Sequence, residues 1–136
     1  MMMRPAILSL AAVLILSSCA PGNGELHVVQ KVKSPDGSLT AAYVQSTPGG
    51  APVGTAENVY VFAGDVPMRY SDRVFADECV NNVRVSWLGP RELRIAYGIR
   101  AGHEPTRSPG PWWTFGHVPH GLTVRFEPHL TKDTYC

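Results

Sequence analysis

The sequence has little of what long helices, membrane spans or nucleic-acid surfaces require. Its main apolar run, residues 6–16, covers roughly 11 residues, or ~17 Å as a helix, which is too short for a hydrocarbon core of ~30 Å. No stretch repeats apolar side chains with the 3.6-residue helical period, and 13 glycines and 12 prolines favour turns and short elements. The 12 Lys and Arg residues nearly balance the 11 Asp and Glu residues and form no basic block, which argues against a nucleic-acid surface.

The first residues have the pattern of an export signal. Arg4 supplies a positive charge and the short apolar run follows it, which favours a cleaved signal over a transmembrane helix. The run ends in Leu16-Ser17-Ser18-Cys19, an aliphatic residue, two small residues and a cysteine. This stretch resembles the lipobox of bacterial prolipoproteins. The alternative is a cysteine that lies by chance in a plain secretory signal.

The resemblance implies an anchor and a location. Cleavage before Cys19 would make it the mature N-terminus, and its thiol would carry a diacylglyceryl group, with a third acyl chain on its nitrogen in many bacteria. Two or three acyl chains hold a protein durably on a membrane. We therefore expect a helical signal peptide over residues 1–18, a lipidated tether over 19–24 and a single antiparallel β domain over 25–136. Because Ala20 follows the cysteine, the resemblance favours the outer membrane, facing the periplasm, in a Gram-negative cell envelope.

Three cysteines are an odd number, so one of them is left over if the others pair. Lipidation of Cys19 would leave Cys79 and Cys136, an even pair in an oxidising compartment. A bridge between them would close a loop of about 58 residues and stabilise the fold by about 4 kcal/mol on chain-entropy arguments. The alternatives are two free thiols, or a metal-binding or catalytic cysteine. We predict the disulfide, because no local Cys-His pairing surrounds Cys79.

The body of the chain predicts β structure. Apolar and polar side chains alternate in six short stretches, the pattern of half-buried strands. These stretches lie near residues 26–32, 39–44, 58–62, 83–87, 93–97 and 122–126. We predict a mainly β fold, a small antiparallel sheet or sandwich of about six strands with one face of the sheet forming the core. Residues 71–79 are expected to hold one helical turn.

Turn and strand residues carry a second resemblance. In the turn Ser34-Pro35-Asp36-Gly37, proline presets φ and glycine permits a positive φ, so the flanking stretches form a hairpin. This SPDG hairpin is similar to that of WD-like propeller repeats, but one copy is too short for a propeller. A closer likeness is to small, uncharacterised bacterial envelope proteins, which share the hairpin, a V-x-V-x-W strand over 83–87 and an L-x-I-x-Y strand over 93–97. The likeness rests on core and turn residues, so it implies a fold and no mechanism.

The segment between residues 98 and 121 has no periodicity and gathers aromatic and imidazole side chains. Loops of this length are often functional. Exposed aromatic rings stack on sugars or anchor partner proteins, whereas buried ones would cover one end of the sheet as core, and both interpretations stay open. The possible binding surface consists of Trp112, Trp113, Phe115, His117 and His120.

No pattern in the sequence points to catalysis or to a bound metal. His117 and His120 have H-x-x-H spacing, but Pro119 argues against the helix that would place both rings on one face. No set of ligands that includes His103 has a known zinc-site spacing, and neither a nucleophile elbow nor a P-loop is present. We expect no metal, no cofactor, no nucleic-acid partner and no enzymatic activity.

These patterns together predict a lipid-anchored cell-envelope protein whose small β domain is a structural or protein-interaction module. Its partners would be the membrane, through the anchor, and another envelope component. The alternative is a module that binds glycan or peptidoglycan through Trp112 and Trp113. A metal-dependent enzyme that uses the histidines of the same loop is the third hypothesis.

Overall fold

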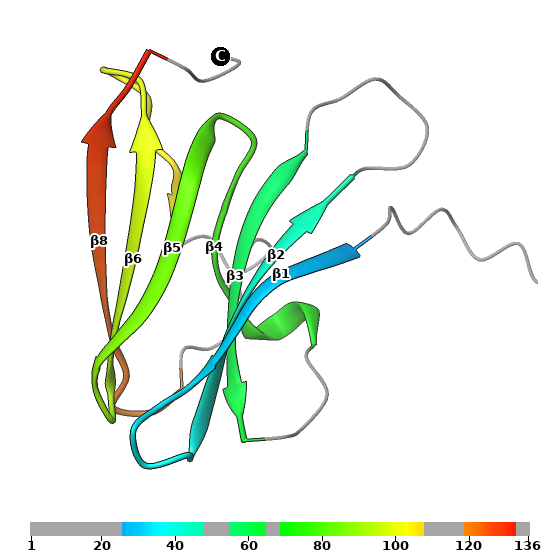
Figure 1. Cartoon of the computed structure of the whole chain (residues 1–136), viewed down its shortest axis with the longest axis vertical. Helices are drawn as coiled ribbons and strands as arrows, with labels where there is room; N and C mark the ends of the chain where they lie inside the picture. Colours follow the sequence, from blue (N-terminus) through cyan, green and yellow to red (C-terminus); the bar gives the residue numbers. More distant parts are fainter. Residues whose placement is uncertain (1–25, 48–54, 65–68, 108–118, 133–136) are drawn as a thin grey trace, which may run out of the picture.

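The computed structural model describes residues 26–47, 55–64, 69–107 and 119–132. These residues form eight β-strands in two sheets, which confirms a mainly β fold (Figure 1). Sheet A has the strand order β1-β2-β3-β4-β7, and sheet B has the order β5-β6-β8. The strands are β1 (Leu26–Lys33), β2 (Leu39–Ser46), β3 (Ala56–Ala63), β4 (Arg73–Asp77), β5 (Val80–Gly89), β6 (Glu92–Ile99), β7 (Thr106–Arg107) and β8 (Thr123–Leu130).

The described residues include one short helical element, the 3-10 turn η1 (Tyr70–Asp72), which comes immediately before β4. Within the described ranges, no helix has the length and apolar character needed to cross a membrane.

The predicted turn between β1 and β2 is confirmed in detail. The carbonyl of Ser34 accepts a hydrogen bond from the Gly37 N–H at 2.8 Å, and Gly37 has a φ of +73°. The Asp36 carboxylate accepts hydrogen bonds from the Ser38 N–H at 3.0 Å and from the hydroxyls of Ser38 and Ser34 at 2.7 and 2.8 Å. These hydrogen bonds lower the pKa of Asp36 from 3.8 to about 2, and the bond from the Ser38 N–H has the largest effect.

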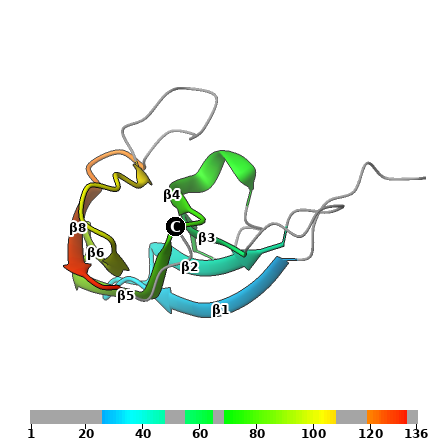
Figure 2. The same cartoon turned by 90° about the horizontal axis from the view of Figure 1, so that it is seen from above.

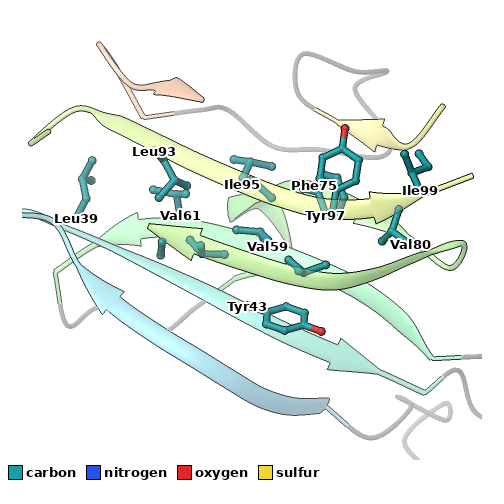
Figure 3. Close-up of a cluster of buried hydrophobic side chains, with 14 residues drawn as sticks. Leu39, Tyr43, Val59, Val61, Phe75, Val80, Leu93, Ile95, Tyr97 and Ile99 are labelled. Carbon is teal, nitrogen blue, oxygen red and sulfur yellow. The ribbon is translucent and has the colours of Figure 1, made fainter. Parts of the chain in front are cut away.

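The core lies between the two sheets, where apolar side chains of β2 to β6 point inward (Figure 3). Leu93 and Ile95 of β6 are fully buried, as their alternation predicts. The ring of Phe75 in β4 lies 4.9 Å from that of Tyr97 in β6 and 6.2 Å from that of Phe126 in β8, measured between centroids. Aromatic packing therefore joins the two sheets from the inside.

A row of side-chain hydrogen bonds joins the sheets along β1 and β5. The Gln30 amide donates to the Val85 carbonyl at 3.1 Å, and its oxygen accepts from the Val85 N–H at 3.3 Å. Two residues further along both strands, the Trp87 indole N–H donates to the Val32 carbonyl at 3.0 Å. We call these four residues the seam. Figure 2 shows the result as one curved wall that runs from β8 through β5 and β1 to β4.

The structure corrects the expected strand arrangement at one pairing. β8 lies parallel to β6, in register from Glu92 opposite Thr123 to Ile99 opposite Leu130, whereas the other pairings are antiparallel. After β6 the chain crosses to sheet A, where β7 pairs with β4, before it returns to sheet B. β8 therefore enters its sheet from the same end as β6, which a hairpin connection does not allow.

Two local expectations also need correction. Residues 71–79 hold the end of the η1 turn and then a strand, β4, that pairs with β3. Sheet A is buried on both faces at β2 and β3, not on one, because Ala42, Val44, Tyr60 and Phe62 form a second buried cluster opposite the core. A strand that is buried on both faces has a continuous run of apolar residues. The sequence pattern alone therefore does not show which of its residues face the core between the sheets.

Replacing Gln30 with methionine is expected to weaken the seam without a large change of side-chain volume. The variant leaves the Val85 N–H and carbonyl without their side-chain partner, which should lower the free energy of unfolding by about 1–3 kcal/mol. Urea unfolding followed by circular dichroism measures the change. The matched control is His27→Ala, an exposed position on the same strand. Equal stabilities of Gln30→Met and His27→Ala would contradict a stabilising seam.

The turn also predicts a pH dependence. Because the pKa of Asp36 is lower in the folded chain than its ordinary value of 3.8, ionised Asp36 stabilises the fold above pH 3.8, and that contribution is lost as the pH falls through about 2. The stability difference between wild type and Asp36→Asn should therefore shrink over this window, as measured by urea unfolding at several pH values. Glu104→Gln, which removes an exposed carboxylate outside the turn, is the control. A difference that stays constant down to pH 2 would contradict the role of Asp36.

Candidate functional site

Most residues of the predicted sites lie outside the described residues. They are Cys19, Trp112, Trp113, Phe115, His117 and Cys136. The aromatic binding surface and the lipid anchor therefore stay predictions. Two predicted site residues are described: His120 is exposed in the turn before β8, and Cys79 is half-buried in the turn between β4 and β5.

Cys79 lies beside a histidine and an aspartate that the sequence does not bring together. The His103 Nε2 is 2.9 Å from both carboxylate oxygens of Asp77, whose side chain is 8% exposed. The same carboxylate accepts a hydrogen bond from the Cys79 N–H. Asp77 is the last residue of β4, and His103 lies in the connection between β6 and β7. Their contact therefore holds this connection against the end of β4.

The side chains of Asp77, Cys79 and His103 place possible metal-ligand atoms within 4.8 Å of one another. The sulfur of Cys79, however, is in a disulfide, and a disulfide sulfur is not the thiolate that metals bind. The two remaining side chains bond to each other. Since Cys19 and Cys136 both lie outside the described residues, the pairing of Cys79 with Cys136 stays a prediction.

A second polar cluster lies inside sheet A. The Tyr43 hydroxyl donates to Glu57, and the Gln45 amide donates to the Tyr43 oxygen and to Glu57, each at 3.2 Å. Burial, and then the hydrogen bond to Glu57 and the charge of that carboxylate, raise the pKa of Tyr43 well above its usual range. The phenol therefore stays protonated as a donor, and the cluster satisfies its own buried polar groups.

The outer face of sheet B is hollowed along its central strand. Leu93, Ile95 and Tyr97 of β6 point to the core, so Ala96 and Gly98 face outward and form the floor of a groove. Side chains of β5 and β8 rise on both sides of this floor. We call this the sheet B groove, and its polar lining consists of Asn82, Arg84, Ser86, Arg94, Glu127, His129 and Thr131.

An irregularity of the backbone forms one end of the sheet B groove. The pairing of β5 with β6 shifts register between Asn81 and Arg84, and Asn82 has a φ of 49°, a left-handed conformation. Opposite this bulge, a Cβ on Gly98 would lie 2.0 Å from the Asn81 Oδ1, so any larger residue there would require the Asn81 side chain to move. Bulges redirect side chains at such places, and here the bulge is followed by Arg84 on the wall of the groove.

The charges of the groove are arranged across three strands. Arg84 of β5, Ala96 of β6 and Glu127 of β8 lie opposite one another in register. The Arg94 Nε donates to the Ser86 hydroxyl at 3.1 Å and lies 3.8 Å from the Glu127 carboxylate, so the Glu127 charge has a counter-charge. Arg84 is exposed and has neither an ion pair nor a hydrogen bond from its side chain to another described residue. Its positive charge is therefore open to a ligand.

The alternation of apolar and polar residues over 83–87 and 93–97 places Arg84 and Arg94 on the face opposite the core, but it does not predict the groove. A local pattern shows which face of a strand each side chain takes, and it does not show which strands are neighbours. The signal in the sequence that could have indicated the groove is the pair of small outward residues, Ala96 and Gly98, in a strand whose flanking strands carry large polar side chains. No family model, curated protein or solved structure matches the chain.

The predicted disulfide can be tested directly. Alkylation of non-reduced protein followed by proteolysis and mass spectrometry should give a disulfide-linked pair of peptides that contain Cys79 and Cys136. The same digest after reduction is the control and should release both peptides. Recovery of Cys79 and Cys136 as alkylated thiols, or of Cys79 linked to Cys19, would contradict the pairing.

Proposed function

We propose that the chain is a lipid-anchored cell-envelope protein whose β domain is a non-catalytic interaction module. The observation that carries the anchor is the stretch Leu16-Ser17-Ser18-Cys19 at the end of a short apolar run. Under this proposal the acylated Cys19 becomes the mature N-terminus. Its acyl chains insert in the membrane, and the β domain is held beside the lipid surface.

The start of the described fold supports this arrangement. β1 begins at Leu26, seven residues after Cys19. At no more than ~3.6 Å per residue, the intervening chain reaches about 25 Å at most, so the domain stays close to the lipid headgroups. A tether of this length suits a partner or ligand that is itself near the membrane.

The roles of the buried polar groups support an interaction module rather than an enzyme. Asp77 holds His103 and the turn at Cys79, and Glu57 holds Tyr43. Each of these groups already has a structural partner. The sheet B groove instead leaves a cation open to solvent, and β8 and β6 lie on the side of the molecule away from the start of β1 in both views (Figures 1 and 2).

The anchor is tested by mass spectrometry of protein purified from bacterial membranes. The expected mature chain begins at Cys19 and carries a diacylglyceryl group on that residue. Cys19→Ala should move the protein out of the membrane fraction, whereas Ser18→Ala, which keeps a small residue before the cysteine, should not. An unmodified N-terminus, or a Cys19→Ala protein that stays with the membranes, would contradict the anchor.

A further inference from the structure

We propose that the sheet B groove binds a carboxylate group carried by a short peptide segment. The inference rests on the proposed interaction role and names the chemistry of the partner. It does not depend on the anchor, because every residue of the groove belongs to the described β domain.

The charge of the groove favours an anion. Glu127 has Arg94 as its counter-charge at 3.8 Å, while the charge of Arg84 is not compensated by a described residue. The planar guanidinium of arginine binds carboxylates through two parallel hydrogen bonds. A carboxylate that enters between the two walls would therefore bind Arg84, with Glu127, which is paired with Arg94, and the exposed His129 on the opposite wall.

Side-chain contacts and backbone geometry fix part of the groove. Ser86 and Glu127 hold the Arg94 side chain in place, and the bulge at Asn82 sets the backbone that leads into Arg84. The small side chain of Ala96 keeps the floor of the groove low, whereas the side chains of Asn81 and Thr131 lie over the floor at Gly98. A ligand therefore meets an Arg94 side chain and a backbone at Arg84 that need little rearrangement, which lowers the entropy that binding loses.

The groups along the walls favour a peptide over a sugar. Asn82, Ser86 and Thr131 supply amide and hydroxyl groups, which pair with peptide N–H and carbonyl groups. Sugar-binding grooves generally present an aromatic face for stacking. Among the described residues that line the groove, Tyr97 is the one Phe, Tyr or Trp, and it is 1% exposed.

Calorimetric titration of the full chain in detergent micelles at low ionic strength tests the inference. The probes are acetyl-trialanine with a free C-terminal carboxylate, its C-terminal amide, an acetyl-Ala-Glu-Ala amide and glucuronate. Binding of at least one carboxylate peptide is expected, at least tenfold tighter than the amide of trialanine. The two carboxylate peptides distinguish a chain terminus from an acidic side chain as the source of the carboxylate. Added salt should weaken the binding.

Variants assign the binding to the groove. Arg84→Gln should raise the Kd about tenfold or more, and Ala96→Leu should do so by filling the floor without a change of charge. Arg91→Gln removes an exposed arginine from the nearby β5–β6 turn and should change the Kd less than about twofold. Circular dichroism checks that each variant is folded, and Ala96→Ser, which adds little volume, should keep the wild-type Kd.

Three outcomes would overturn the inference. They are no binding of any carboxylate peptide, tighter binding of glucuronate than of the peptides, and an Arg91→Gln variant that loses as much affinity as Arg84→Gln. None of them bears on acylation of Cys19, which is measured separately by mass spectrometry. A failure of the groove and a failure of the anchor are therefore distinguishable.

Discussion

The fold depends on a glutamine side chain that takes the place of a neighbouring strand. β5 is an edge strand of sheet B, and Val85 turns its N–H and carbonyl toward β1. The side-chain amide of Gln30 presents an N–H donor and a carbonyl acceptor side by side, so it pairs with both groups of Val85. Two residues further along both β1 and β5, the Trp87 indole N–H donates to the Val32 carbonyl and adds a second bond between the strands. Without these bonds, two edges would face each other with unpaired backbone groups.

The seam has consequences for the far side of sheet B. Because it holds β5 against β1, the apolar faces of both sheets meet, and Phe75 of β4 reaches the rings of Tyr97 and Phe126. The polar side chains of β5, β6 and β8 must then face outward. The groove is thus the outer surface of a sheet whose inner surface is committed to the core. Its shape follows from register, because small residues of β6 lie between large residues of its two neighbours.

Local alternation predicted six of the eight strands and the hairpin turn, because a period of two depends only on which face is buried. It did not predict β4, Arg73–Asp77, where three adjacent apolar residues conceal the period, nor the two residues of β7. The parallel pairing of β8 depends on the path of a long connection. The groove depends on the alignment of Arg84, Ala96 and Glu127 across three strands, and no local pattern contains that alignment.

The most direct test of this account is amide hydrogen exchange at Val85, resolved by residue with NMR. If the Gln30 side chain replaces a strand, the Val85 N–H is hydrogen-bonded on the open edge of sheet B. Its exchange should then be as slow as that of amides within the β5–β6 ladder. Exchange of Val85 at the rate of an exposed amide, with the ladder still protected, would contradict a closed seam and the fold that depends on it.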